Sequence, residues 1–107
     1  MKLRKINFSN ILFLEADTNY TSIFYADGTK TVSSYNLGVF EKEIEDVGDF
    51  LKISKSTIIN KRYLVEFLRV KDTGSVLLTN GYRIKVARRK LAILSAEKRK
   101  SFFLGKM

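Results

Sequence analysis

Tight-turn signals between strand-length segments constrain the fold of this 107-residue chain more than any other feature. Asp27-Gly28, Asp72-Thr73-Gly74 and Asn80-Gly81 each lie between segments long enough for one strand. Asn-Gly in particular is the strongest short-range signal for a hairpin. The chain contains no proline, so no strand is interrupted by a missing amide donor. This spacing predicts a mainly β fold.

The apolar runs give the approximate positions of the strands. We expect one strand at 11–14 and two strands in 21–35 joined at Asp27-Gly28. Residues 50–59 contain another, because the β-branched side chains at 57–59 favour a buried strand. Two further segments follow at 64–70 and 75–87, and the second of them turns at Asn80-Gly81.

One amphipathic helix is predicted over about residues 36–48. Apolar residues recur at steps of three, four and three, namely Leu37, Phe40, Ile44 and Val47. Asn36 is a suitable N-cap, and Gly48 is expected to end the helix. The outward face is acidic, with Glu41, Glu43, Glu45 and Asp46 opposed by Lys42. Such a face repels phosphate and should point away from it.

A short C-terminal helix is expected over residues 89–100, with Leu91, Leu94 and Ile93 facing inward. No internal repeat or low-complexity linker divides the sequence. We therefore predict one compact, strand-dominated domain over residues 1–107.

The composition excludes several classes of site. The chain has no cysteine and no histidine, which excludes disulfides, thiolate metal sites and histidine-dependent triads. The carboxylates and lysines are scattered, without a paired acidic motif or a glycine-rich phosphate cradle. We therefore expect no catalytic residues, no metal site, no cofactor and no enzymatic activity. The sequence also lacks an apolar run of about 20 residues and a signal-peptide core, which favours a cytoplasmic protein.

Charge is divided unevenly along the chain. The formal net charge is +9, from 20 basic and 11 acidic side chains. Residues 1–49 carry 5 basic and 8 acidic groups, a balance of −3, whereas residues 50–107 carry 15 and 3, a balance of +12. A concentrated positive charge suggests a polyanionic partner, either nucleic acid or an anionic membrane surface. Improved solubility is the alternative explanation.

Three polar segments follow or join the predicted strands: residues 17–22 (DTNYTS), 52–60 (KISKSTIIN) and 84–90 (IKVARRK). Each has a simpler explanation, because Asn, Thr and Ser make turns and isolated basic residues cover soluble surfaces. Serine, lysine and arginine are also common phosphate contacts. Taken singly, none of the three segments is specific.

Together, these segments resemble the LytTR family of bacterial DNA-binding domains over about residues 6–95. The matching motifs occur in order: ILFLEA (11–16), NYT (19–21), Asp27-Gly28, a helix led by Leu37, FLKISKSTIIN (50–60), Asn80-Gly81 and KVARRK (85–90). The central motif of the family consists of an aromatic residue, a basic residue, a small polar stretch, serine, two branched aliphatic residues and asparagine. FLKISKSTIIN matches this motif, and its last residue is Asn60.

The resemblance implies an elongated all-β domain whose loops enter successive major grooves on one side of the duplex. By matching motif, the base-contacting positions are Thr21, Lys55 and Arg88. The phosphate contacts would be Asn19, Tyr20, Ser56, Arg89 and Lys90. Arginine suits this role because its guanidinium can bond guanine O6 and N7 together, which is worth ~1–3 kcal/mol of discrimination. Lysine also reaches guanine, and threonine offers a hydroxyl and a methyl to base edges.

The implied function is transcription regulation through double-stranded DNA at promoter sites with direct-repeat character, without membrane binding. The sequence leaves undecided whether two copies form a homodimer on DNA. It also leaves undecided whether an upstream signalling domain or partner outside this chain receives the signal. LytTR domains usually follow a receiver domain or a membrane segment, neither of which this sequence shows, so it is either a stand-alone regulator or an excised domain.

Two other functions also stay open. Single-stranded RNA could stack on Tyr20, Phe24 or Tyr25, and a protein partner could bind the acidic helix. Asn60 is expected to satisfy backbone groups in a turn rather than to read a base.

Overall fold

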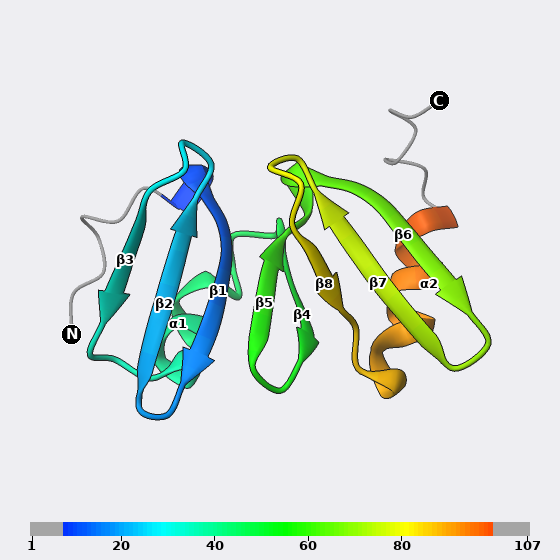
Figure 1. Ribbon diagram of the computed structural model, residues 1–107. Coiled ribbons are helices and arrows are strands. Elements are labelled where there is room, and N and C mark those ends of the chain that lie inside the picture. Colours follow the sequence, from blue (N-terminus) through cyan, green and yellow to red (C-terminus); the bar gives the residue numbers. More distant parts are fainter. Residues whose placement is uncertain (1–7, 100–107) are drawn as a thin grey trace.

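The computed structural model describes residues 8–99, which form two antiparallel β-sheets lying side by side (Figure 1). The first sheet has the order β3-β2-β1-β5-β4 and the second the order β6-β7-β8. The strands are β1 (Ile11–Asp17), β2 (Tyr20–Tyr25), β3 (Lys30–Ser33), β4 (Phe50–Ser54), β5 (Thr57–Asn60), β6 (Leu64–Val70), β7 (Thr73–Leu78) and β8 (Arg83–Lys85). This arrangement confirms the mainly β prediction.

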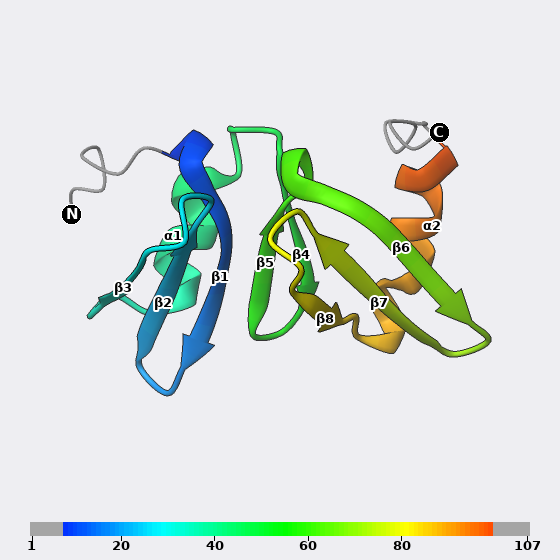
Figure 2. The ribbon, with the colours of Figure 1, turned by 45° about the horizontal axis from the view of Figure 1, so that its top comes forward.

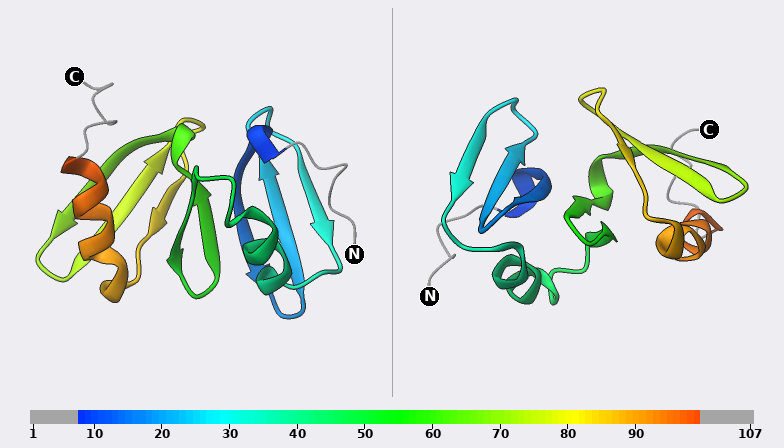
Figure 3. Two further views of the ribbon diagram at one scale, coloured as in Figure 1. Left: turned by 180° about the vertical axis from the view of Figure 1, so that it is seen from behind. Right: turned by 60° about the horizontal axis from the view of Figure 1, so that its bottom comes forward.

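The helical elements are α1 (Leu37–Ile44), α2 (Leu91–Arg99) and the single 3-10 turns η1 (Phe8–Asn10), η2 (Lys61–Tyr63) and η3 (Arg88–Lys90). Seen from behind, α1 lies over the first sheet and α2 over the second (Figure 3). Neither of the two α-helices in the described residues is long and apolar enough to cross a membrane.

Two hairpins form where the turn signals predict them. Gly28 turns β2 into β3 with a φ of +94°, and Gly81 lies between β7 and β8 with a φ of +93°. A side-chain oxygen stabilises each turn, because Asp27 accepts the Thr29 amide at 2.9 Å and Asn80 accepts the Tyr82 amide at 3.0 Å. These are the turns in which Asp and Asn mimic a backbone acceptor.

The turn between β6 and β7 differs from the prediction. Its two turn residues are Lys71 and Asp72, since Val70 pairs with Thr73 across the hairpin. Lys71 takes the left-handed conformation, with a φ of +56°, that a glycine would be expected to supply. Gly74 lies instead within β7, where a Cβ atom would collide with the side chain of Leu91. The glycine is therefore explained by close packing and not by the turn.

A bulge in β1 lets one strand serve two apolar cores. The register between β1 and β2 shifts between Ile11 and Phe13, so the regular alternation of side chains is broken there. One core lies between the first sheet and α1. It contains Ile11, Leu14, Ile23, Leu37, Phe40, Ile44 and Ile58. The other joins both sheets and α2 through Leu12, Phe13, Ile53, Ile59, Leu64, Phe67, Val76, Leu78, Val86, Leu91 and Leu94. The two sheets are thus parts of one packed unit.

Helix α1 is shorter than predicted. Asn36 caps it as expected, since its side chain accepts the Val39 amide at 3.2 Å, but the helix ends at Ile44. The prediction that Val47 faces the core is wrong, because it lies in the following turn and is 42% exposed. Gly48 belongs to that same turn, with a φ of +91°.

Helix α2 packs through Leu91 and Leu94, which are 1% and 0% exposed. Ile93 is 42% exposed, so the expectation that it faces inward is wrong. The reason is helical geometry, since the buried positions 91 and 94 are one turn apart and position 93 lies to the side of them. Arg89 and Lys90, expected to begin this helix, instead form the separate turn η3 together with Arg88. Residue 100, the last of the predicted helix, lies outside the described residues.

Candidate nucleic-acid interface

The turns β1–β2, β4–β5 and β6–β7 and the segment after β8 all lie along one edge of the molecule, the lower edge in Figure 1. The rotated view in Figure 2 shows the same order along this edge. The three polar segments that sequence analysis singled out are therefore brought to one side. The molecule measures 38 × 25 × 24 Å along its principal axes, and the row of turns follows its length in Figure 1.

Backbone hydrogen bonds connect neighbouring members of this row. The Ala16 amide donates to the Ser56 carbonyl at 2.8 Å, which joins the end of β1 to the β4–β5 turn. The Ala87 amide donates to the Ile53 carbonyl at 2.8 Å, which joins β4 to the segment after β8. Because main-chain atoms make both bonds, the spacing of the loops does not depend on flexible side chains. The edge is a preformed surface.

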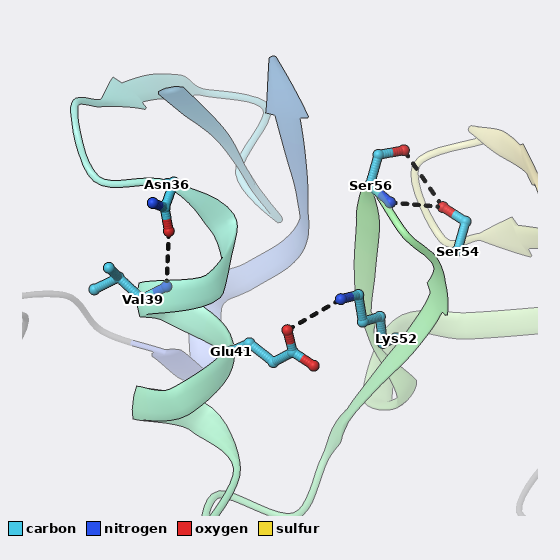
Figure 4. Close-up of polar contacts among 6 residues, drawn as sticks. All are labelled: Asn36, Val39, Glu41, Lys52, Ser54 and Ser56. Carbon is cyan, nitrogen blue, oxygen red and sulfur yellow. Dashed lines mark hydrogen bonds and ion pairs between the residues drawn. The ribbon is translucent and has the colours of Figure 1, made fainter. Parts of the chain in front are cut away.

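The β4–β5 turn is built to project Lys55. The Ser54 hydroxyl accepts the Ser56 amide at 3.2 Å and lies 3.4 Å from the Ser56 hydroxyl, which tightens the turn around Lys55 (Figure 4). Ile53 is fully buried, as the alternation along β4 predicts. Lys55 is exposed because it lies in the turn after Ser54, where the alternation ends. The two serines therefore support the turn as well as lining the surface beside it.

Lys55 and Arg88 line the same hollow. Its volume is about 590 Å³, and it is lined by Ser54, Lys55, Ser56, Ala87, Arg88 and Arg89. Four of the residues predicted to contact DNA thus share one concave surface, although they come from segments about 30 positions apart in sequence. No acidic side chain lines the hollow in the described part of the chain, so its charged groups favour an anion.

Arg88 begins η3, and its side chain is 77% exposed. Its Nη2 atom donates to Oδ2 of Asp72 at 3.2 Å, so the guanidinium is held toward the β6–β7 turn. The Lys90 amide donates to the Ala87 carbonyl at 2.8 Å, which closes the turn that carries the three basic residues. Sequence analysis missed Asp72 because it read this residue only as a turn former, and its pairing depends on a contact across two hairpins.

Thr21 is not presented to a ligand. It lies inside β2 with 0% of its surface exposed, and its hydroxyl donates to the Tyr35 carbonyl at 2.9 Å. Base contact by Thr21 would require this strand to open, so the structure gives the residue a role in joining β2 to the approach to α1. Asn19 and Tyr20 are exposed beside it, and Tyr20 is 52% exposed.

The β1–β2 turn has an unusual backbone conformation. Thr18 has a φ of +56°, which is rare for a β-branched residue. The strained residue directly precedes Asn19, the first of the predicted phosphate contacts. Backbone strain of this kind is concentrated at functional sites.

Other expected features lie away from the hollow. Asn60 is 1% exposed; its amide donates to the Ile11 carbonyl at 2.9 Å and its oxygen accepts the Arg62 amide at 3.0 Å. This confirms its structural role. Glu41, on the acidic side of α1, forms a 3.0 Å ion pair with Lys52 of β4 (Figure 4).

Three of the aromatic rings are packed together. Phe24 stacks on Phe13 with ring centroids 4.3 Å apart, and Tyr82 meets both rings edge-on. The Lys30 ammonium lies 5.2 Å from the centre of the Phe24 ring. The Phe24 ring is already occupied by these contacts, which weakens the proposal that it stacks on an RNA base.

One carboxylate outside the interface has a shifted pKa. The Thr29 hydroxyl donates to Asp27 at 2.6 Å, and this bond, followed by the bond from the Thr29 amide, lowers the pKa of Asp27. The residue lies in the β2–β3 turn, on the edge opposite the hollow (Figure 1). Within residues 8–99, no cluster of acidic side chains could hold a metal ion.

Comparison with known proteins identifies the family. The model of the LytTr DNA-binding domain matches residues 1–98. The chain belongs to the LytTR family. DNA binding in transcription regulation is the function of this family, and the resemblance inferred from the motifs is confirmed.

A solved structure shows the same fold. It is the LytTr DNA-binding domain of a Bacillus cereus protein named as a methyl-accepting/DNA response regulator. It is 22% identical, the match covers 85% of this chain and 83% of that one, and the TM-score is 0.74. No curated protein matches the chain significantly. At this identity the likeness establishes the LytTR fold and not the residues that contact DNA.

Proposed function

We propose that this LytTR domain binds double-stranded DNA sequence-specifically and regulates transcription by inserting the loops of its lower edge into successive major grooves. The observation that carries the proposal is the hollow shared by Lys55 and Arg88. Two cations from separate elements line it and no acidic side chain does, although Arg88 also pairs with Asp72 of the neighbouring turn. The hollow lies at an edge formed by turns, which a groove can accept. Solubility alone would not require cations from distant parts of the chain to converge.

The chemistry assigns different roles to the residues of the edge. Arg88 is exposed and can form the two parallel hydrogen bonds that select guanine. Lys55 projects from a tight turn and reaches guanine as a point charge, with less geometric selectivity. Contacts to phosphate would come from Ser56, Arg89 and Lys90, which follow the two base-reading positions in sequence, and from Asn19 and Tyr20 in the β1–β2 turn. The exposed Asn19 and Tyr20 also replace the buried Thr21 as the polar groups of the first loop.

The length of the domain suits contact with two successive major grooves of DNA. One turn of B-DNA measures ~34–36 Å, and half-sites on one side of the duplex recur at that spacing. The domain is 38 Å long, and its loops are distributed along that length. A row of loops joined by backbone hydrogen bonds can therefore meet two adjacent major grooves without rearrangement.

The distribution of charge favours one orientation of the domain toward DNA. Glu41 and its acidic neighbours belong to α1 and the turn after it, which lie behind the first sheet (Figure 3). The basic η3 lies at the lower edge. Because DNA attracts the second surface and repels the first, electrostatics favours approach by the loops.

The regulatory context is part of the same proposal. Sites with direct-repeat character would each take one copy of the domain, and two copies could then contact one another on DNA. Signal reception would belong to an upstream domain or a partner. A protein that meets promoter DNA in this way would act in the cytoplasm of a bacterium.

Selection from a random duplex pool tests the proposal, followed by titration of the selected duplex and a scrambled duplex across a salt series. We expect an enriched motif in two or more parts about one helical turn apart, with a specificity ratio that persists as salt rises. Binding that follows salt alone, with no enriched motif, would show a nonspecific polyanion surface and overturn the proposal.

A further inference from the structure

The carboxylate of Asp72 lies at the basic edge, where a nucleic-acid-binding domain would be expected to avoid negative charge. Residues 50–107 carry 15 basic side chains and 3 acidic ones, and Asp72 is one of the three. It occupies the tip of the β6–β7 turn, and its Oδ2 atom lies 3.2 Å from Nη2 of Arg88. The acid is thus paired with the arginine best placed to read bases.

Several hydrogen bonds fix the backbone of the turn that carries this carboxylate. Lys71 adopts a left-handed φ of +56°, and its carbonyl accepts the Arg69 Nε–H at 3.0 Å. The Thr73 hydroxyl donates to the Val70 carbonyl at 3.0 Å on the other side of the turn. The Val86 amide donates to the Gly74 carbonyl at 2.9 Å, which ties the turn to the segment that carries Arg88. These bonds bring the backbone at Asp72 close to the segment that carries Arg88, and the short Asp72 side chain then reaches the guanidinium.

Stability does not explain the pair. The Asp72 and Arg88 side chains are 67% and 77% exposed, and exposed ion pairs contribute ~0–1 kcal/mol. A carboxylate this close to DNA also opposes binding, because it repels phosphates. A residue that adds little stability and weakens general affinity needs another explanation.

The geometry leaves Arg88 able to bind a base. Guanidinium has five N–H donors, and Asp72 accepts from Nη2 alone. The donors that remain can still form a bidentate contact with guanine. Phosphate competes for the same donors, but a phosphate close to Arg88 would also lie close to the Asp72 carboxylate. The neutral edge of a guanine carries no such penalty.

From these observations we propose that Asp72 is a specificity-determining residue, which positions Arg88 for a base and keeps it from backbone phosphate. This inference rests on the proposed function, since it needs Arg88 to read DNA. Asp72 would lower the affinity for all DNA and raise the ratio of specific to nonspecific binding.

The test compares two variants that remove one negative charge each. Asp72→Asn removes the charge beside Arg88, and Glu66→Gln removes the charge from the 3.2 Å pair with Arg83 in the second sheet. Both pairs are exposed, so both variants should keep their fold, which circular dichroism verifies. Affinity is measured on the duplex selected by the unmodified protein and on a scrambled duplex at several salt concentrations.

We expect both variants to bind scrambled DNA more tightly, because each adds one net positive charge. In D72N, however, the ratio of selected to scrambled affinity should fall on the order of 3- to 10-fold, a part of the discrimination that a bidentate arginine supplies. In E66Q this ratio should stay unchanged. When Arg88→Ala is already present, D72N should no longer lower the ratio, because the arginine that it positions is absent.

Each other result overturns the inference. An unchanged ratio in D72N, or an equal fall in E66Q, would show that Asp72 acts only through general charge. A fall that persists in the R88A background would separate Asp72 from Arg88. Failure of the proposed function is recognised separately, because the unmodified protein would then select no motif, and the inference would fall with it.

Discussion

Leu91 packs against Gly74 so closely that a Cβ atom at position 74 would collide with its side chain. Leu91 begins α2 and directly follows η3, the turn that carries Arg88, Arg89 and Lys90. The absence of a side chain at Gly74 therefore lets α2 approach the second sheet, and α2 in turn fixes where the basic turn lies. Core packing and the position of the predicted base-reading arginine are connected through this contact.

Gly74→Ala should lower the free energy of unfolding by about 1–3 kcal/mol, because overpacking shifts neighbouring groups. Leu91→Ala alone should cost about 2–5 kcal/mol, because Leu91 is 1% exposed. In the double variant, the smaller side chain at 91 makes room for the methyl at 74, so the loss should be less than the sum. Urea unfolding measures all three, and additive losses would show that the two residues are not in conflict.

Thr21→Val tests whether the buried threonine is structural. The valine keeps the shape but leaves the Tyr35 carbonyl without the hydroxyl donor, so we expect a loss of about 1–3 kcal/mol in stability and an unchanged base preference. Asn19→Ala, at an exposed turn position, should instead weaken DNA binding and leave stability within about 0.5 kcal/mol. A changed base preference in folded T21V would restore base contact to Thr21.

Lys55→Ala and Lys90→Ala should have different effects on DNA binding. Lys55 projects from the β4–β5 turn, so its loss should relax the preference at one or two base pairs of the selected site. Lys90 should contact phosphate, so its loss should weaken binding to every sequence equally and reduce the salt slope by about 1. Anisotropy titrations on single-base-pair variants measure both, and identical profiles for the two variants would contradict the assignment.

The Asp27 carboxylate predicts a small acid-dependent contribution to stability. Its pKa is lowered by the Thr29 hydroxyl, so its contribution is complete above the ordinary carboxyl pKa and is lost as pH falls through the lowered value. Thr29→Val removes the main donor and should raise the pKa of Asp27, without affecting DNA binding at the opposite edge. An NMR titration of the Asp27 carboxyl carbon measures the shift, and an unchanged pKa in T29V would assign the effect to another group.

Local patterns predicted the elements well because each depends on nearby residues. Gly28 and Gly81 mark the turns, Asn36 caps α1, and the alternation around Ile53 gives the inward face of β4. The predictions failed where a distant element decides the outcome. Gly74 was assigned to a turn, although Leu91, 17 positions later in sequence, explains it.

The sequence predicted which segments contribute to the candidate site, but it did not predict how these segments come together as one surface. Basic composition and motif order indicated residues 52–60 and 84–90, yet the hydrogen bond from Ala87 to Ile53 that joins them has no local signal. The same reason explains Thr21. Its burial follows from the pairing of β2 with β3 and from the Tyr35 carbonyl 14 positions away, neither of which the NYT motif reveals.

Guanine methylation interference on the selected duplex tests the central claim most directly, because a methyl group at N7 blocks the major-groove face that an arginine reads. We predict interference at guanines in two clusters about one helical turn apart. Arg88→Ala should abolish it at one position and leave the other cluster unchanged. Absence of interference at any guanine, or an identical pattern in R88A, would contradict groove reading by the loops of this edge.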